Sequence, residues 1–280
     1  AKRVRAKLPQ LPIIDYVSPT VWAWRPGRAR KMRAYVDHLL ALLPFEPQVH
    51  ERLGGPRTTY VGHPLIERVT EFRPASDEAQ LRNTKPPTVL ILPGSRRAEI
   101  ERLLDLFGET AQQLVERVGE VDFVLPAVSH LKDIIEARIA HWPCKVRLVF
   151  GEDEKLKAFR QARAALAASG TVSLELALAQ VPMVIAYRVG KVEEWIVRAL
   201  ATAPSIVLPN LILGEKVIPE FLQEDASPST LSKALAQLIG DTPAREAQLA
   251  ALTKLDDVMQ LPDGQSPSAL CAQIILSYVK

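Results

Sequence analysis

Short apolar runs and longer amphipathic stretches alternate in this chain from residue 88 to residue 210. The short runs have the composition of strands, and the longer stretches carry apolar residues at the spacing of a helix face. We expect strands within residues 88–96, 121–128, 145–150, 164–168, 182–187 and 205–210. We expect helices between them, including 171–180 and 192–201. Because strands that alternate with helices assemble into parallel sheets, the sequence predicts an α/β fold with a doubly wound sheet.

The first part of the chain lacks this regular alternation of strands and helices. Residues 13–19 and 58–64 read as strands, and a polar stretch with three prolines follows at residues 68–87. Such a composition is typical of a boundary between domains, and 280 residues are enough for two of them. We therefore divide the chain into a first domain at 1–70, a linker at 71–87, a second domain at 88–240 and C-terminal helices at 241–280.

Composition excludes several classes of protein. Apolar residues make up 48% of the chain and charged residues 24%, as in globular proteins. The two cysteines, Cys144 and Cys271, have neither metal-binding nor disulfide-framework spacing, which favours a reducing cytoplasm. We find no apolar run long enough to span a membrane and no signal peptide. The chain opens without Met and enters a fold midway, so we expect a fragment.

Positive charge is concentrated near the N-terminus. Residues 1–35 hold nine Lys or Arg against the single acid Asp15. Trp22 and Trp24 lie beside these cations, an arrangement that suits bases, acyl chains or a membrane interface, although one tryptophan is expected to be core. The basic segment is either a solvated face or a surface for a membrane, a phosphorylated substrate or nucleic acid.

Distinctive residues follow several of the predicted strands. Ligands of open α/β sheets bind outside the carboxyl ends of the strands, so these residues would face one crevice. They are Gly94, Ser95, Arg96, Ser169, Gly170, Thr171, Tyr187, Arg188 and Asn210. The glycines permit close approach, and Arg96 offers a forked donor for phosphate, with a surface ion pair as its alternative. Glu175 would meet vicinal hydroxyls such as those of a ribose, unless it only complements a helix dipole.

Other kinds of site have weaker support. The sequence contains neither a G-x-G-x-x-G pattern nor a Walker sequence, and its His, Cys and Asp residues have no metal spacing. His63 ends a strand of the first part and is a weak candidate for catalysis, since a lone histidine is more often structural. We expect no metal and no cofactor.

A series of motifs resembles the lipid-A-disaccharide synthase family. In chain order they are VSPTVWAWRPGRARKM, LLPFE, VGHPL, LPGSRRAEI, ASGTVSLELAL, PMVIAYR and LPNLILGEKVIPEFLQED. The resemblance covers about residues 13–240 and implies a GT-B fold of two Rossmann-like domains, the first incomplete and on the acceptor side, the second binding a UDP-sugar. It also implies a reaction: UDP-2,3-diacylglucosamine and 2,3-diacylglucosamine 1-phosphate give a β-1,6-linked disaccharide and UDP. The family works without an obligatory metal at the cytoplasmic face of the Gram-negative inner membrane.

The resemblance also implies roles for single residues. Ser169, Gly170 and Thr171 would receive the UDP diphosphate, and Glu175 would bind the ribose. Arg96 would balance charge on the leaving diphosphate, and Asn210 and Gln223 would hold the donor or acceptor sugar. Gly94, Ser95, Tyr187 and Arg188 would also take part in binding the UDP-sugar. The membrane and the acceptor phosphate would meet Trp22, Trp24, Arg25, Arg28, Arg30, Lys31 and Arg33.

The chain departs from the family pattern at its start. The Gly-rich first strand and a GIDxPDFN-like segment are absent, about 100 residues in all, and the family's favoured base is the Asp of that segment. We therefore expect the catalytic base upstream of Ala1 and no activity from this chain alone. The alternatives are a UDP-N-acetylglucosamine 2-epimerase, a non-catalytic fragment, or a nucleic-acid binder, which the absence of a binding motif disfavours. The resemblance further suggests a homodimer.

Overall fold

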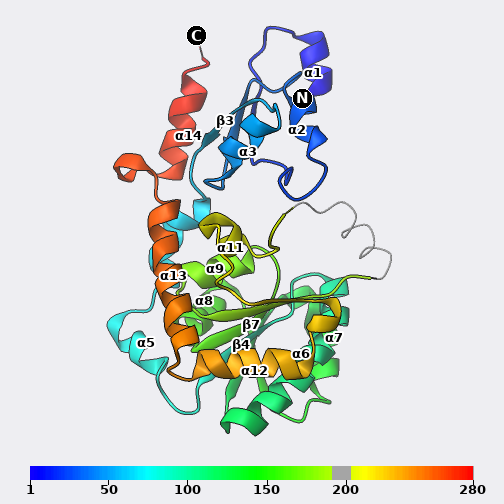
Figure 1. The fold of residues 1–280 in the computed structure, drawn as a ribbon, viewed down its shortest axis with the longest axis vertical. Helices are drawn as coiled ribbons and strands as arrows, with labels where there is room; N and C mark the ends of the chain where they lie inside the picture. Colours follow the sequence, from blue (N-terminus) through cyan, green and yellow to red (C-terminus); the bar gives the residue numbers. More distant parts are fainter. Residues whose placement is uncertain (191–202, 280) are drawn as a thin grey trace. The chain divides into compact units, whose positions relative to one another are not determined.

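The computed structural model describes residues 1–190 and 203–279, which form two compact units (Figure 1). Of these residues, unit 1 contains 1–68, 203–204 and 256–279, and unit 2 contains 69–190 and 205–255. The helix expected at 192–201 lies outside the described residues.

Unit 2 is built on a six-stranded parallel sheet of order β6-β5-β4-β7-β8-β9. Its strands are β4 (Thr88–Leu92), β5 (Asp122–Ala127), β6 (Val146–Phe150), β7 (Ala164–Ala168), β8 (Met183–Tyr187) and β9 (Glu220–Leu222). The strand order reverses between β4 and β7, which makes this the switch point of a doubly wound sheet. The predicted α/β fold with a parallel sheet is thus confirmed.

The strand predicted at residues 205–210 is wrong. This segment leads into helix α11 (Leu208–Leu213), and Pro209 lies in its first turn. Proline lacks an amide hydrogen, so it suits the first turn of a helix and interrupts a strand ladder. The sixth strand is instead β9, which the sequence did not predict because three residues are too few to show periodicity.

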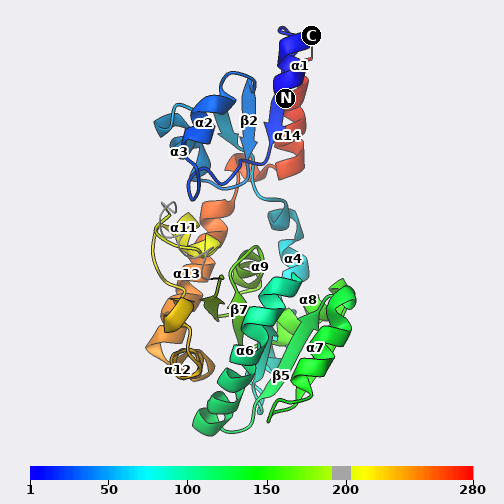
Figure 2. The ribbon, with the colours of Figure 1, turned by 90° about the vertical axis from the view of Figure 1, so that its right-hand side faces the viewer.

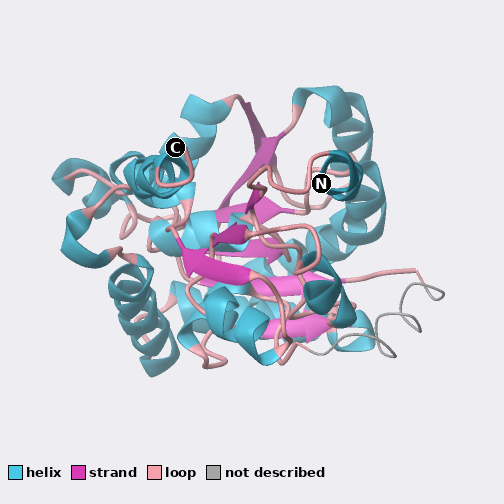
Figure 3. Ribbon diagram, turned by 90° about the horizontal axis from the view of Figure 1, so that it is seen from above, coloured by secondary structure: helices cyan, strands magenta, loops and turns pink. Residues whose placement is uncertain are grey.

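Helices cover both faces of the unit 2 sheet (Figures 2 and 3). On one face α6 (Arg97–Val118) packs against α12 (Pro228–Ile239), and both contact β7. The other helices are α7 (Lys132–Ile139), α8 (Glu152–Gln161), α9 (Val172–Leu178) and α13 (Pro243–Met259). Between sheet and helices lies a core that includes Val89, Ile91, Leu104, Phe107 and Leu235, each at most 1% exposed. This burial holds the strand ends in fixed positions.

Residues 69–87 of the polar stretch are part of unit 2 rather than a separate linker. They form α4 (Val69–Phe72) and α5 (Ser76–Leu81), which contacts α8. Just beyond α5, Arg82 donates to the carbonyls of Arg160 and Ala179, both at 2.8 Å, near the ends of α8 and α9. It also donates to Phe159 and Gln180, and burial lowers the pKa of its guanidinium to about 10. A cation at helix C-termini complements their dipoles.

Unit 1 has a smaller parallel sheet of order β1-β2-β3. The strands are β1 (Ile14–Tyr16), β2 (His38–Ala41) and β3 (Arg57–Tyr60), with helices α1 (Lys2–Lys7), α2 (Gly27–Met32), α3 (Glu46–Arg52) and α14 (Pro267–Leu276). Met32, Val36 and Leu39 pack together in its core. β2 is buried throughout, as expected of a central parallel strand.

Residues from both ends of the chain complete unit 1. The Tyr60 hydroxyl donates to the Met259 carbonyl at 2.6 Å. The Ser268 hydroxyl donates to Glu67 Oε1 at 2.6 Å. The Tyr278 hydroxyl lies 3.2 Å from His38 Nδ1. The last helix is therefore part of the same unit as the first strands.

Candidate functional site

A pocket of about 380 Å³ lies at the carboxyl ends of β4 and β7. Seven of the residues predicted from the sequence line it, namely Gly94, Ser95, Arg96, Ser169, Gly170, Thr171 and Glu175. They come from two loops more than seventy positions apart, which the parallel pairing of β4 with β7 brings together. The pocket occupies the switch point, where α/β sheets bind their ligands.

The loop at residues 94–96 is held by a carboxylate from the helix that follows it. Glu99 Oε2 accepts the backbone N–H groups of Ser95 at 3.0 Å and Arg96 at 3.2 Å, and Arg96 Nη1 lies 3.1 Å from Glu99 Oε1. Gly94 has φ +112°, and a Cβ at this position would lie 2.7 Å from that of Glu99. Only glycine fits here, because any side chain would meet both strain and a clash.

The opposite wall contains an ion pair. Glu175, on α9, lies 2.9 Å from Lys155 Nζ, and both side chains are largely buried at 17% and 22% exposure. Glu175 was predicted from the sequence, whereas Lys155, which lines the same pocket, was not. Lys155 lies mid-helix on α8 two positions from the exposed Lys157, and no sequence pattern distinguishes the two lysines.

Four further predicted residues are absent from the described lining of this pocket. Tyr187 ends β8, Arg188 follows it, and Gln223 follows β9, so all three lie at the same edge of the sheet. Arg188 donates to the Ala226 carbonyl at 2.6 Å, and Gln223 Oε1 accepts the Val189 N–H at 2.8 Å. These side chains tie neighbouring strand ends together.

Asn210 has a different position from the one predicted. It is 2% exposed and lies on α11. Its amide nitrogen donates to the Ile218 carbonyl at 2.9 Å, and Oδ1 accepts the N–H groups of Val217 and Ile218. This geometry does not support the predicted contact with a sugar, because the amide is engaged by the loop that leads into β9.

His63 is a structural residue of unit 1. Its Nδ1 accepts the Leu65 N–H at 3.2 Å, and burial lowers the pKa of the imidazole. The preceding Gly62 has φ +82°, and a Cβ there would lie 2.7 Å from Pro267. The glycine and histidine are thus explained by the backbone turn and its packing.

The two tryptophans of the basic segment differ. Trp22 Nε1 donates to the buried Glu46 at 3.2 Å, and its ring meets Phe45 edge-on with centroids 5.5 Å apart. Trp24 instead lies beside Arg25, whose guanidinium carbon is 5.3 Å from the ring centroid. Five of the nine cations of this segment lie within residues 25–33 and are exposed, namely Arg25, Arg28, Arg30, Lys31 and Arg33. Trp22 is thus half-buried and packed against Phe45 and Glu46 within unit 1, although it is not fully buried as one of the two tryptophans was expected to be.

Within 1–190 and 203–279 no group of three or more His, Cys, Asp or Glu side chains is placed to hold a metal ion. In the same ranges no helix has both the length and the apolar character needed to cross a bilayer.

Several solved structures share this fold, and some of them are described with a nucleotide bound. The spinosyn rhamnosyltransferase SpnG, complexed with thymidine diphosphate, matches with a TM-score of 0.59 at 14% identity over 98% of this chain and 70% of its own. Anabaena HepE in complex with UDP and glucose gives 0.55 at 12% identity over 100% and 74%. The fold is therefore that of the GT-B glycosyltransferase class, as Acinetobacter baumannii MurG also indicates (TM-score 0.55, 15% identity, 98% and 68% covered).

Sequence comparison identifies the family within that class. The chain belongs to the lipid-A-disaccharide synthetase family, whose model matches residues 1–274. A lipid-A-disaccharide synthase from Nitrobacter winogradskyi is 54% identical over 280 residues, which are 100% of this chain and 70% of that protein. One from Rhodospirillum centenum is 40% identical, with 99% and 69% covered. The resemblance drawn from the motifs is confirmed, and the epimerase alternative is not favoured.

Proposed function

We propose that this chain joins UDP-2,3-diacylglucosamine to 2,3-diacylglucosamine 1-phosphate, forming a β-1,6-linked disaccharide and releasing UDP. Its relatives of 54% and 40% identity are named lipid-A-disaccharide synthases, which supports the reaction. The observation that carries the proposal is the convergence of Arg96, Lys155, Thr171 and Glu175 on one pocket at the switch point of unit 2. HepE, which shares the fold, is described with UDP and glucose bound.

The pocket offers complementary groups for each part of UDP. Arg96 and Lys155 supply positive charge for the diphosphate, and Gly170 lets it approach the backbone beside Thr171. Glu175 accepts hydrogen bonds from the ribose hydroxyls. Two cations facing the leaving diphosphate stabilise the charge that develops there, so we propose a transfer that needs no metal ion.

We propose that Tyr187, Arg188 and Gln223 border the sugar, since they lie at the ends of β8 and β9 on the same edge of the sheet as the pocket. The contacts of Arg188 and Gln223 with residues 226 and 189 suit a role in shaping that part of the site. We assign no general base among the described residues, because His63 has one ring nitrogen engaged and burial lowers its pKa.

The basic segment of unit 1 supports a peripheral association with an anionic membrane. Arg25, Arg28, Arg30, Lys31 and Arg33 are exposed within nine positions. Each cation near such a surface contributes at most about 1 kcal/mol before screening. We propose the cytoplasmic face of the inner membrane of a Gram-negative bacterium as the site of action, and a homodimer as the assembly.

The donor site is tested by titrating UDP calorimetrically into the chain and three variants. Arg96→Ala and Glu175→Ala should each weaken binding tenfold or more, since a charge-assisted contact is worth about 1.5–3 kcal/mol. Arg97→Ala is the matched control, because Arg97 pairs with Glu101 and does not line the pocket. Unchanged UDP binding in both pocket variants would contradict the assignment.

The reaction is tested by thin-layer chromatography of products from the two lipid substrates. We would assay a chimera in which this chain replaces the matching residues of the Nitrobacter winogradskyi relative. The disaccharide should form in the chimera and be lost with Glu175→Ala. UDP release without the disaccharide would contradict the proposed transfer.

The membrane proposal is tested by sedimentation with vesicles that contain anionic lipid. Binding should fall as salt rises and fall further when Arg28, Arg30, Lys31 and Arg33 are neutralised. Association that is indifferent to salt and to these substitutions would show apolar insertion instead.

A further inference from the structure

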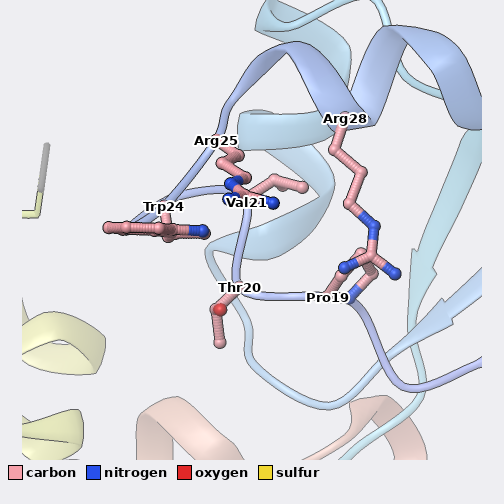
Figure 4. A pocket seen from close by; sticks show the side chains of 6 residues that line it. All are labelled: Pro19, Thr20, Val21, Trp24, Arg25 and Arg28. Atoms are coloured by element: carbon pink, nitrogen blue, oxygen red, sulfur yellow. The ribbon is translucent and has the colours of Figure 1, made fainter. Parts of the chain in front are cut away.

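A second pocket, of about 230 Å³, lies in unit 1 (Figure 4). It is lined by Pro19, Thr20, Val21, Trp24, Arg25 and Arg28. The geometry points to a phosphomonoester site in this pocket, which takes the phosphate of the acceptor through the guanidinium groups of Arg25 and Arg28. The inference rests on the proposed function, since that reaction requires an acceptor with a phosphate.

The charges of this pocket are uncompensated. Neither Arg25 nor Arg28 has a carboxylate partner among the described residues, and Arg25 is engaged only with the face of Trp24. By contrast, Arg5 of the same unit pairs with Asp37. Two guanidinium groups without a counter-ion are strong donors for a dianionic group, and their forked geometry matches phosphate oxygens.

The pocket also has the shape of a small binding site. Figure 4 shows Arg28 extending from α2 toward Pro19, with Trp24 and Arg25 on the other side. Val21 lies between them and is fully buried, and Thr20 adds a hydroxyl. A volume of about 230 Å³ has room for a phosphate and part of the group that carries it, but not for an acyl chain.

Hydrogen bonds and ring packing hold the loop that carries these residues in place. The Ser18 hydroxyl lies 2.8 Å from His50 Nε2, and both residues are buried. Trp22 is held by Glu46 and Phe45, as described above. The Thr20 carbonyl accepts the N–H groups of Ala23 at 3.0 Å and Trp24 at 2.9 Å. Arg25 is thus presented from a fixed turn rather than from a free loop.

Arg25 also has an uncommon backbone conformation. Its φ is +51°, in the left-handed region that residues other than glycine and asparagine avoid. Such a conformation is retained where the surrounding structure imposes it, and it occurs often at ligand sites. Here it directs the side chain of Arg25 into the pocket that Arg28 lines from α2.

The test is calorimetric titration of glucosamine 1-phosphate, with glucosamine as the ligand that lacks the phosphate. Saturating UDP is included so that the donor pocket of unit 2 is filled. The phosphate ester should bind and glucosamine should not. Arg25→Gln or Arg28→Gln should weaken binding about tenfold or more, and Arg28→Lys should weaken it several-fold although the charge is kept.

Arg3→Gln with Arg52→Gln is the matched control. These arginines are exposed on α1 and α3 and do not line the pocket, so their loss should leave phosphate binding within about twofold. Equal weakening by both pairs would overturn the inference in favour of a diffuse basic face. Equal binding of glucosamine, or no binding of its phosphate, would overturn it too.

Phosphatidylglycerol vesicles distinguish a lipid headgroup from the phosphomonoester. If vesicle binding depends on Arg25 and Arg28 while glucosamine 1-phosphate does not bind, the pocket serves the membrane and the inference fails. The titration of UDP reports separately on the proposed function, because Arg25 and Arg28 belong to unit 1 and the UDP pocket to unit 2. If the wild-type chain binds UDP but does not bind glucosamine 1-phosphate, only this inference is overturned and the proposed function is not.

Discussion

The two pockets carry positive charge in opposite ways. In unit 2, Arg96 and Lys155 each already contact a carboxylate, Glu99 and Glu175. In unit 1, Arg25 and Arg28 have no such partner among the described residues. A ligand that binds the pocket of unit 2 must therefore compete with the carboxylates already paired with Arg96 and Lys155. A ligand that binds the pocket of unit 1 meets guanidinium groups without a carboxylate partner. Binding to unit 2 therefore depends on whether the ligand fits the positions of the paired groups. Binding to unit 1 depends mainly on the charge of the ligand, so its affinity should fall more steeply as salt rises.

The largest effect is expected from a substitution that disturbs the backbone of the unit 2 pocket. Gly94→Ala places a Cβ against Glu99 in a strained conformation, which should cost roughly 2–4 kcal/mol of unit 2 stability and weaken UDP binding. Gly119→Ala is the control, since Gly119 has φ +86° but nothing within 4 Å of an added Cβ. It should show the strain alone and keep UDP binding. Urea unfolding and calorimetry measure both, and equal costs for the two variants would contradict this account.

The next effect is a dependence of the stability of unit 1 on pH. Burial lowers the pKa of His38, His50 and His63, all in unit 1, below the ordinary value of 6.5. The unfolded chain then binds more protons than the folded one as the pH falls through 6.5, so unit 1 loses stability on acidification. Each histidine adds a slope of at most about 1.4 kcal/mol per pH unit.

Thermal unfolding between pH 7.5 and 5.5 measures this effect. Burial raises the pKa of Glu46, so protonation of this carboxyl acts in the opposite direction at the acidic end of the range. The clearest decline is therefore expected above pH 6. A unit 1 transition that does not move with pH would contradict the burial of these imidazoles.

A smaller effect tests whether the partner of Glu175 takes part in binding. Lys155→Ala should weaken UDP binding about fivefold, because it removes one positive charge near the diphosphate and leaves Glu175 without its ion pair. Lys157→Ala, exposed on the same helix, should change nothing. Calorimetric titration of UDP into both variants measures this difference. If the two variants bind UDP with the same affinity, Lys155 has only a structural role.

The smallest effect separates binding from stability at Arg96. Its side chain is 84% exposed and its ion pair with Glu99 lies at the surface. Exposed pairs contribute little, so Arg96→Ala should change the free energy of unfolding by less than about 1 kcal/mol. A larger loss of stability would mean that the fall in UDP affinity reports unfolding rather than a lost contact.

The sequence predicted the parts of the fold that depend on local pattern. The strands β4 to β8 were found because buried parallel strands are continuous apolar runs between amphipathic helices. β9 was missed, and the run at 205–210 was misread, because a three-residue strand and an apolar helix start have no distinctive period. Pro209 was the available signal against a strand.

The same division holds for the candidate site. Gly94, Ser169 and Thr171 were predicted to meet because the carboxyl ends of parallel strands share one edge. Lys155 and Glu99 come from within helices, and their direction depends on how each helix packs on the sheet. Asn210 was misassigned because an amide that closes a loop and an amide that binds a sugar look alike in sequence.

The contacts that close unit 1 have a consequence for how the chain folds. They join residues 199, 201 and 240 positions apart, through Tyr60, Glu67 and Tyr278. Contacts of such long sequence separation form late, since the closure of a long loop opposes them. During synthesis, residues 69–190 and 205–255 can complete unit 2 before α14 leaves the ribosome, whereas unit 1 must wait for it. The strands β1 to β3, although they are synthesised before unit 2, are therefore the last to reach their final packing.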